Sequence, residues 1–307
     1  MESDEGPTVS VIIPTYYRNE ELINALESVT EQTYPHIECI VVDDSGERFA
    51  EEAIDTDSLT YIAHEQNQGA PVARLTGLEE ATGTYVQFLD DDDYLYPRKV
   101  EAQVELIEQS DVGVVYCGIR MADGREILPT KEQLAEIRKR ALTFDLWPCY
   151  TCSMLIEREL LLDIDDFTKY EGAQDGALRI ELAHATEFDA VFEVLVDRTD
   201  TDRSLGDSRR AVTAHFDMIE GKSELYAAAG EDVRRQALAY AYSYKGFYYM
   251  RYHFWSGQAC LSFLRAVMIR PQRGNVLPFL ASIFGKPGWK AGQTIKRALG
   301  GTSGPAK

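Results

Sequence analysis

The chain has 307 residues, 45% of them hydrophobic, and its formal net charge is −20, from 51 acidic and 31 basic residues. The length is ample for one α/β domain of about 200 residues with an extension, and the acidic excess argues against nucleic acid as a partner. No apolar run approaches the ~20 residues that a membrane-spanning helix needs, and five cysteines without a disulfide framework are typical of a cytosolic protein.

Strands and helices are predicted to alternate through the first hundred residues. The β-rich apolar residues 9–14 predict a buried strand, and apolar residues at helical spacing predict a helix over residues 20–33. A second strand is predicted at 37–42, a further helix opens at Asn67, and another strand covers 85–89. This alternation predicts a parallel α/β sheet.

Acidic residues stand directly after two of these strands. Asp43 and Asp44 follow the second strand, and four consecutive aspartates, residues 90–93, follow the strand at 85–89. Open α/β sheets bind ligands at the carboxyl ends of their strands, and oxygen ligands suit Mg²⁺ or Mn²⁺ held together with substrate phosphates. The alternative is a solvated acidic turn. Neither a GxGxxG motif after the first strand nor a GxxxxGK[ST] motif is present, which disfavours dinucleotide-binding and P-loop proteins.

Four motifs in this order resemble family 2 glycosyltransferases. They are VSVIIPTY at residues 9–16, VVDDS at 41–45, NQG at 67–69 with Ala73 and Arg74, and FLDDDD at 88–93 with Pro97. The resemblance covers roughly residues 8–215. It implies a GT-A fold, with a mixed, mainly parallel sheet and flanking helices, and a typically inverting transfer of sugar from a nucleotide-sugar.

The resemblance also implies a donor site. Pro14, Thr15 and Tyr16 would line the pocket of the base, Asp44 would accept a hydrogen bond from the base, and Arg74 would lie near the diphosphate. Turn chemistry is the alternative role for Asp44, and a helix-surface ion pair is the alternative for Arg74.

The implied metal site lies in the aspartate run. Asp90 and Asp92 match the first and last positions of the family's DxD motif, so both are expected to hold Mg²⁺ or Mn²⁺, Asp92 by direct contact. Asp90 and Asp91 are expected on the donor side of the same site.

One carboxylate beyond the metal site is expected to act as the base. In an inverting reaction a carboxylate takes the proton from the acceptor hydroxyl, and Asp175, at the start of a largely apolar helix, matches the family's base. Family members commonly have Glu-Asp here, whereas this chain has Gln174 before Asp175. A plain charge at a helix N-terminus is the alternative.

Residues 149–156 are expected to form an acceptor-side strand. Its cysteines, Cys149 and Cys152, are interpreted as small buried residues, because one CxxC pair without further ligands is a poor zinc site. Further along, either Arg198 or Arg203 could contact phosphate, with a simple surface loop as the alternative.

Charge divides the chain near residue 232. Residues 233–307 contain no acidic residue and twelve basic ones, so the preceding part carries all 51 acidic residues against 19 basic ones. We expect a catalytic domain over residues 1–215 and a helical, basic region over 216–307. The acidic part suits the high-salt cytoplasm of a halophilic archaeon.

The basic region is also aromatic, with Tyr, Phe and Trp crowded between residues 240 and 255. Basic residues beside aromatic and aliphatic ones are typical of a segment on anionic lipid; packing on the catalytic domain is the alternative. We therefore expect a peripheral protein on the inner face of the cell membrane, with a polyprenyl- or dolichol-linked glycan as acceptor, in N-glycan or surface-polysaccharide assembly. A non-catalytic nucleotide-sugar or lipid-carrier binding module, or a membrane-surface scaffold, is the competing hypothesis.

Overall fold

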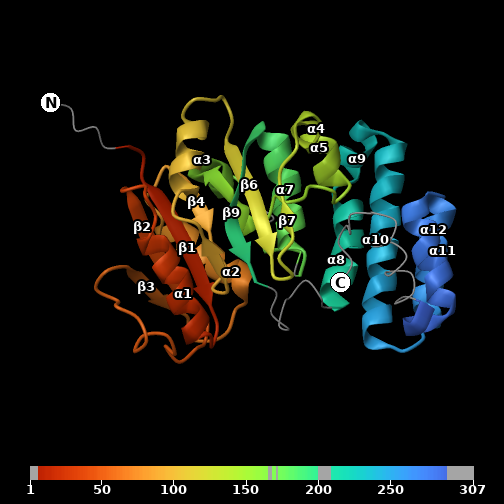
Figure 1. Cartoon of the computed structure of the whole chain (residues 1–307), viewed down its shortest axis with the longest axis horizontal. Coiled ribbons are helices and arrows are strands. Elements are labelled where there is room, and N and C mark those ends of the chain that lie inside the picture. The colour runs from red at the N-terminus through yellow and green to blue at the C-terminus, as the bar shows by residue number, and fades with distance from the viewer. Residues whose placement is uncertain (1–5, 165–167, 171, 200–208, 289–307) are drawn as a thin grey trace. The chain divides into compact units, whose positions relative to one another are not determined.

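The computed structural model describes residues 6–164, 168–170, 172–199 and 209–288 (Figure 1). Packing divides the chain into two compact units. The first unit comprises Met1–Ala141, Leu146–Lys169 and Gln174–Arg203. The second comprises Leu142–Asp145, Tyr170–Ala173 and Ser204–Lys307. The division at residue 215 stays a prediction.

The first unit is built on one mixed sheet. Its strands are β1 (Val9–Thr15), β2 (Ile37–Asp43), β3 (Thr60–Ala63), β4 (Tyr85–Phe88), β5 (Asp93–Leu95), β6 (Val114–Met121), β7 (Glu126–Ile127), β8 (Met154–Glu157) and β9 (Phe188–Arg198). They are ordered β3-β2-β1-β4-β8-β6-β9-β5, with β7 paired to β6. Pairing is parallel from β3 to β4 and between β6 and β9, and antiparallel elsewhere. Most paired residues belong to parallel pairs, which confirms the predicted mixed, mainly parallel sheet.

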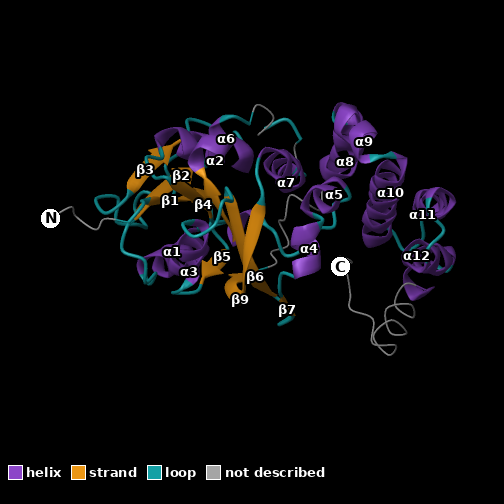
Figure 2. Ribbon diagram, turned by 90° about the horizontal axis from the view of Figure 1, so that it is seen from above, coloured by secondary structure: helices purple, strands orange, loops and turns teal. Residues whose placement is uncertain are grey.

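Helices cover both faces of this sheet. The helices up to α7 are α1 (Asn19–Thr30), α2 (Ala70–Glu80), α3 (Lys99–Ile107), α4 (Lys131–Ala135), α5 (Ile137–Leu142), α6 (Arg158–Leu162) and α7 (Gln174–Ala185), with a 3₁₀ turn η1 at Thr151–Ser153. Figure 2 shows α1 and α3 on one face and α2 and α6 on the other. All seven residues of β1 are buried, as expected of a strand covered on both faces.

The two faces of β1 pack differently. Val11 and Ile13 belong to a large apolar core together with Leu22 of α1 and residues of α3. On the opposite face, α2 approaches so closely that a Cβ built on Gly77 would lie 2.4 Å from Cγ2 of Ile12. Glycine at this position therefore sets the distance between α2 and the sheet.

The prediction of a strand over residues 149–156 is wrong for residues 149–153. Only β8 is extended, and η1 precedes it. The hydroxyl of Ser153 donates to the carbonyl of Pro148 and accepts from the backbone N–H of Tyr150, both at 2.9 Å. Such local side-chain bonds offer the backbone an alternative to a strand ladder.

The second unit is helical, and within it α10, α11 and α12 pack in sequence (Figure 1). Its helices are α8 (Arg209–Gly221), α9 (Ser223–Ala229), α10 (Glu231–Tyr252), α11 (Gly257–Ile269) and α12 (Arg273–Ile283). Phe263 of α11 is fully buried and packs with Met250 of α10. Gly246 leaves room for that ring, because a Cβ there would lie 2.7 Å from it. Across the described residues no helix has the length and apolarity that a bilayer crossing requires.

Candidate functional site

The carboxyl ends of β1, β2 and β4 meet at one edge of the sheet. Thr15 at the end of β1 lies in register with Asp43 at the end of β2, and β1 also pairs in parallel with β4. The backbone N–H of Asp44 donates to the carbonyl of Thr15 at 2.9 Å. The parallel pairing therefore brings the residues after these strands together, as the sequence predicted for a ligand site.

Aromatic residues follow β1 at this edge. Pro14 and Thr15 belong to the buried strand, whereas Tyr16 is exposed and packs edge-on against Tyr17 with 4.7 Å between ring centroids. Tyr17 in turn lies 4.8 Å from the ring of Phe49. The φ angle of Tyr17 is +55°, a left-handed conformation that is uncommon for a bulky residue. Backbone strain of this kind clusters at ligand sites.

Asp44 is buried and holds the loop before α2. Its carboxylate accepts from the backbone N–H groups of Gln68 at 2.8 Å and Gly69 at 2.7 Å, and lies 2.7 Å from Nδ1 of His64. Gly69 has a φ of +88°, which glycine adopts without strain. Asp44 thus fixes the entry to α2, the helix that carries Arg74.

Three of the four aspartates form ion pairs with arginines. Arg74 binds Asp90, and Nη1 of Arg18 lies 3.0 Å from Asp91 and 2.8 Å from Asp92. Burial alone would raise the pKa of Asp90, but the Arg74 guanidinium outweighs it and holds that pKa below its usual range. For Asp91, burial dominates and raises the pKa to about 6.

Asp93 points into the protein instead. It is fully buried, and burial together with the charge of Asp90 raises its pKa well above the usual value. Its carboxylate accepts from the backbone N–H of Thr199 at 3.1 Å. Arg198, which pairs with Asp93 in the β5–β9 ladder, lies 4.3 Å above the ring of Tyr150 and interacts electrostatically with Asp90 and Asp93. Arg203 lies outside the described residues.

The carboxylates of Asp90 and Asp92 are hard oxygen ligands of the kind that Mg²⁺ and Mn²⁺ prefer. Among the described residues, no group of three acidic, His or Cys side chains could hold a metal ion by itself. Two carboxylates supply only some of the ligands that Mg²⁺ takes, so a cation held here would take the others from phosphate oxygens and water.

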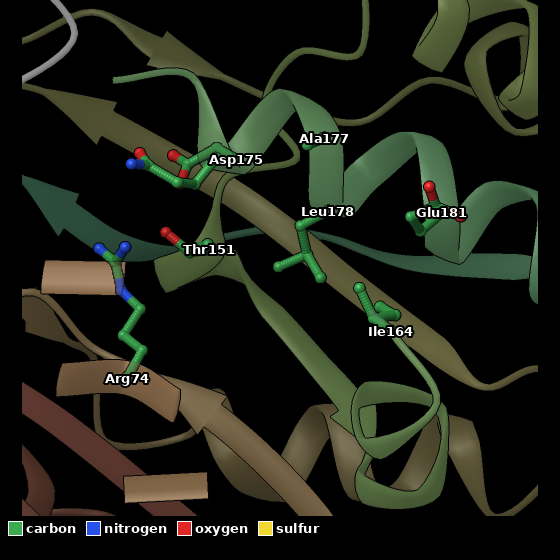
Figure 3. Close-up of a pocket in the computed structure, with 8 residues that line it drawn as sticks. Arg74, Thr151, Ile164, Asp175, Ala177, Leu178 and Glu181 are labelled. Carbon is green, nitrogen blue, oxygen red and sulfur yellow. The ribbon is translucent and has the colours of Figure 1, made fainter. Parts of the chain in front are cut away.

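A pocket joins α2, η1 and α7. It holds about 320 Å³ of space, part of it open to solvent. The residues that line it are Arg74, Thr151, Ile164, Gln174, Asp175, Ala177, Leu178 and Glu181. In Figure 3 the guanidinium of Arg74 gathers with Thr151 and Asp175 at one end, whereas Leu178 and Ile164 line the middle.

The polar end of this pocket keeps unsatisfied hydrogen-bonding groups. Within the described part of the chain, Nε of Arg74 and Nε2 of Gln174 are buried and have no hydrogen-bond partner. Such groups are rare in folded proteins. Arg74 also interacts electrostatically with Asp175. The pocket thus presents a carboxylate beside donors that a ligand could satisfy.

Asp175 is held by its neighbours along α7. Nε of Arg179 donates to the carbonyl of Asp175 at 2.9 Å, and Nη1 of Arg179 donates to the carbonyl of Cys149 at 2.9 Å. Cys149 and Cys152 are buried and free, and burial raises the pKa of Cys149 to about 12. The interpretation of both cysteines as small buried residues is therefore confirmed.

Sequence reasoning placed most of these residues but missed some of their partners. Arg74 joins the aspartates to the pocket of Asp175, which no spacing in the sequence reveals. The roles of Arg18, Thr151 and His64 were also missed. Arg18 stands four residues after Pro14, so its place beyond the end of β1 was the available signal.

Comparisons with known proteins identify a family and a fold. Residues 10–164 match the model of glycosyl transferase family 2. An uncharacterized glycosyltransferase of Haemophilus influenzae is 40% identical over 110 residues, covering 35% of this chain and 37% of the relative. The uncharacterized glycosyltransferase EpsJ of Bacillus subtilis is 33% identical over 171 residues, covering 50% of this chain and 49% of EpsJ. The chain thus matches only about a third to a half of these relatives' length.

Solved structures share the fold. Residues 1–349 of TarS from Staphylococcus aureus align with a TM-score of 0.62 and 18% identity, over 95% of this chain and 92% of that one. The mannosyltransferase PcManGT from Pyrobaculum calidifontis, in complex with GDP-Man and Mn²⁺, aligns with a TM-score of 0.56 and 18% identity, over 96% of this chain and 88% of that one. The predicted GT-A fold is confirmed. The match over half of the sequence shows that the chain belongs to glycosyl transferase family 2.

Proposed function

We propose that the protein transfers a sugar from a nucleotide-sugar to a hydroxyl group of an acceptor, with inversion at the sugar carbon. The observation that carries this proposal is the pocket in which Asp175 faces Arg74, whose guanidinium also binds Asp90 of the aspartate run. The side chain of Arg74 thus connects the proposed base, Asp175, with the aspartates proposed to bind the diphosphate through a metal ion.

Each residue of the site has a role in this reaction. Asp175 takes the proton from the acceptor hydroxyl, and Nε2 of Gln174 donates a hydrogen bond to the acceptor. Arg74 neutralises the diphosphate that leaves. Pro14, Thr15 and Tyr16 line the base pocket, and Asp44 accepts a hydrogen bond from the base.

Asp92 and Asp90 would hold Mg²⁺ or Mn²⁺, and Asp91 would lie on the donor side of the ion. When bound, the ion stabilises the negative charge that develops on the departing diphosphate. A neighbour solved with GDP-Man and Mn²⁺ supports this assignment.

We favour a UDP-sugar as donor, with a GDP-sugar second. One structural neighbour, TarS, is solved with UDP-GlcNAc and another with GDP-Man. We further propose that the acceptor is a glycan linked to polyprenyl or dolichol phosphate, in N-glycan or surface-polysaccharide assembly. The acidic composition of residues 1–232 suits a high-salt cytoplasm.

Calorimetry in high KCl tests the donor site. UDP is expected to bind in the presence of Mn²⁺, and Asp92→Ala is expected to lose that dependence on metal. Asp163→Ala, at the end of α6, removes an acidic residue outside the pocket and is the matched control. No binding of UDP- or GDP-sugars by the wild type, with or without metal, would refute the proposal.

Exposed side chains of the second unit support an acceptor at a membrane surface. Leu261, Leu264 and Met268 are exposed at helical spacing on α11. Leu277 and Leu280 are exposed three residues apart on α12, and Phe284 is exposed at its C-terminal cap. Two neighbouring helices therefore each present an apolar stripe outward.

We propose an anionic bilayer as the surface that these stripes meet, at the inner face of the cell membrane. The chain has no acidic residue after Asp232, and Arg265, Arg273 and Lys286 accompany the stripes. Basic charge beside apolar and aromatic groups favours anionic headgroups.

Flotation with vesicles tests this surface. Vesicles of phosphatidylglycerol are expected to carry the protein, vesicles of phosphatidylcholine much less, and Leu264→Glu with Leu277→Glu are expected to abolish flotation. Equal flotation of the double variant and the wild type would refute the assignment. Association of two copies without vesicles, abolished by the same variant, would show a dimer interface instead.

A further inference from the structure

Arg18 bridges two carboxylates of the aspartate run. It stands at the start of α1, and a single nitrogen, Nη1, lies 3.0 Å from Oδ1 of Asp91 and 2.8 Å from Oδ2 of Asp92. Its side chain is only 18% exposed, and that of Asp92 only 14%. The guanidinium of Arg18 is therefore bound to the carboxylate of Asp92, which is proposed to contact the metal.

The remaining aspartates are also balanced. Arg74 binds Asp90, and Arg198 interacts with Asp90 and Asp93. Three guanidinium groups thus face four acidic side chains. These groups carry a formal net charge of −1, so a divalent cation that enters alone must displace a guanidinium and leaves the site with a net charge of +1.

A nucleotide diphosphate changes this balance. The diphosphate of a nucleotide-sugar brings two negative charges, so the metal and the diphosphate together add no net charge. When Arg18 leaves Asp92, the diphosphate is a new anionic partner for its guanidinium, because phosphate pairs well with arginine. Arg18 need give up only Asp92, because Asp91, which also accepts from the hydroxyl of Thr15 at 3.0 Å, can keep it in place.

We propose that Arg18 is a built-in counter-ion that holds Asp92 in the donor-free protein and yields it only when metal and nucleotide diphosphate arrive together. The metal and the nucleotide then bind with positive coupling, and each raises the affinity of the other by the same factor. This inference rests on the metal and donor site of the proposed function.

Binding of Mn²⁺ to the full chain tests the inference without any turnover. Free Mn²⁺ is measured by its electron paramagnetic resonance signal, with and without UDP, and with GDP in parallel. In the wild type, the nucleotide is expected to tighten Mn²⁺ binding at least tenfold. Arg18→Met is expected to bind Mn²⁺ alone at least tenfold more tightly than the wild type, with much weaker coupling to the nucleotide.

Two further variants complete the design. Arg18→Lys keeps the positive charge and is expected to retain the coupling. Arg125→Met removes the same charge from a turn where Arg125 pairs with exposed Asp123, and is expected to match the wild type. Melting curves show which variants are folded.

The outcomes separate this inference from the proposed function. Folded Arg18→Met that binds Mn²⁺ alone no more tightly than the wild type would overturn the counter-ion role while leaving the donor site intact. Wild-type protein that binds Mn²⁺ equally with and without nucleotide would overturn it as well, whatever the variants do. Wild-type protein that binds no Mn²⁺ even with nucleotide would overturn the metal site itself.

Discussion

Replacing Asp44 by alanine tests whether this carboxylate is needed for the fold as well as for recognition of the base. Its oxygens have three partners: the N–H groups of Gln68 and Gly69, and the ring of His64. Asp44 itself is buried. Asp44→Ala therefore leaves these groups without their acceptor in a place where water enters poorly.

The size of the effect follows from these contacts. A hydrogen bond to a charged group contributes about 1.5–3 kcal/mol. Gln68 and Gly69 are partly accessible, so water can replace part of the loss, and we expect about 2–4 kcal/mol in total. For a protein of this size that lowers the melting temperature by about 5–10 °C. Asp44→Asn keeps one oxygen and should lose about half as much.

Thermal melting in high KCl measures the effect, and UDP calorimetry below the transition measures binding. Asp57→Ala removes an exposed carboxylate from the same part of the chain and should melt like the wild type. We expect Asp44→Ala to lose both stability and nucleotide affinity, because the loop that it holds leads to Arg74. A variant that melts within about 1 °C of the wild type would refute the structural role.

Three other predictions concern the base and the core. Asp175→Asn should lower sugar transfer by about 10²–10⁴-fold and leave donor binding unchanged, since it removes only the proton acceptor; loss of UDP binding in calorimetry would contradict this. Gly77→Val should destabilise the protein by about 1–3 kcal/mol through overpacking against Ile12. If urea titration gave this variant the stability of the wild type, the close approach of α2 to the sheet would be contradicted. Lys99 is fully buried, its Nζ has no hydrogen-bond partner among the described residues, and burial lowers its pKa from 10.5 to about 8. Between these values the unfolded chain binds more protons, so this residue makes stability rise with pH. Lys99→Met should remove that rise and be more stable than the wild type at pH 7 by about 1–3 kcal/mol. Urea titrations from pH 7 to 10.5 measure this. Lys139→Met, at an exposed site, is the control and should behave like the wild type.

The strands and helices of the first hundred residues could be predicted because their apolar patterns are strong. The strand predicted at 9–14 is observed as β1, and the helix predicted at 20–33 begins and ends within three residues of α1. β6, which pairs with three other strands, was not singled out, because a short apolar run cannot by itself be distinguished from a helix segment. At 149–153 the local bonds of Ser153 override the extended conformation.

In the candidate site, the sequence indicates which residues matter but not which side chains contact one another. Motifs single out Asp92 and Asp175 as candidates, because their residue types and order are visible in the sequence. The pairing of Arg18 with Asp91 depends on contacts across 73 residues of chain, which no local pattern encodes.

The second unit is assembled from three separate stretches, and this has a consequence for how the protein can be recombined. Phe144 lies 4.9 Å from the ring of His215 and 5.3 Å from that of Tyr240, and Lys222 lies over the ring of Tyr170 at 5.6 Å. Residues 142–145 and 170–173 thus belong with helices far along the chain, and the second of these stretches leads directly into α7. Consider a hybrid protein joined at a single point, with its terminal helices taken from a relative. The two residues of each aromatic contact would then come from two different proteins. The helices therefore have to be exchanged together with the stretch that leads into α7, so a change to the terminal region reaches the segment next to Asp175.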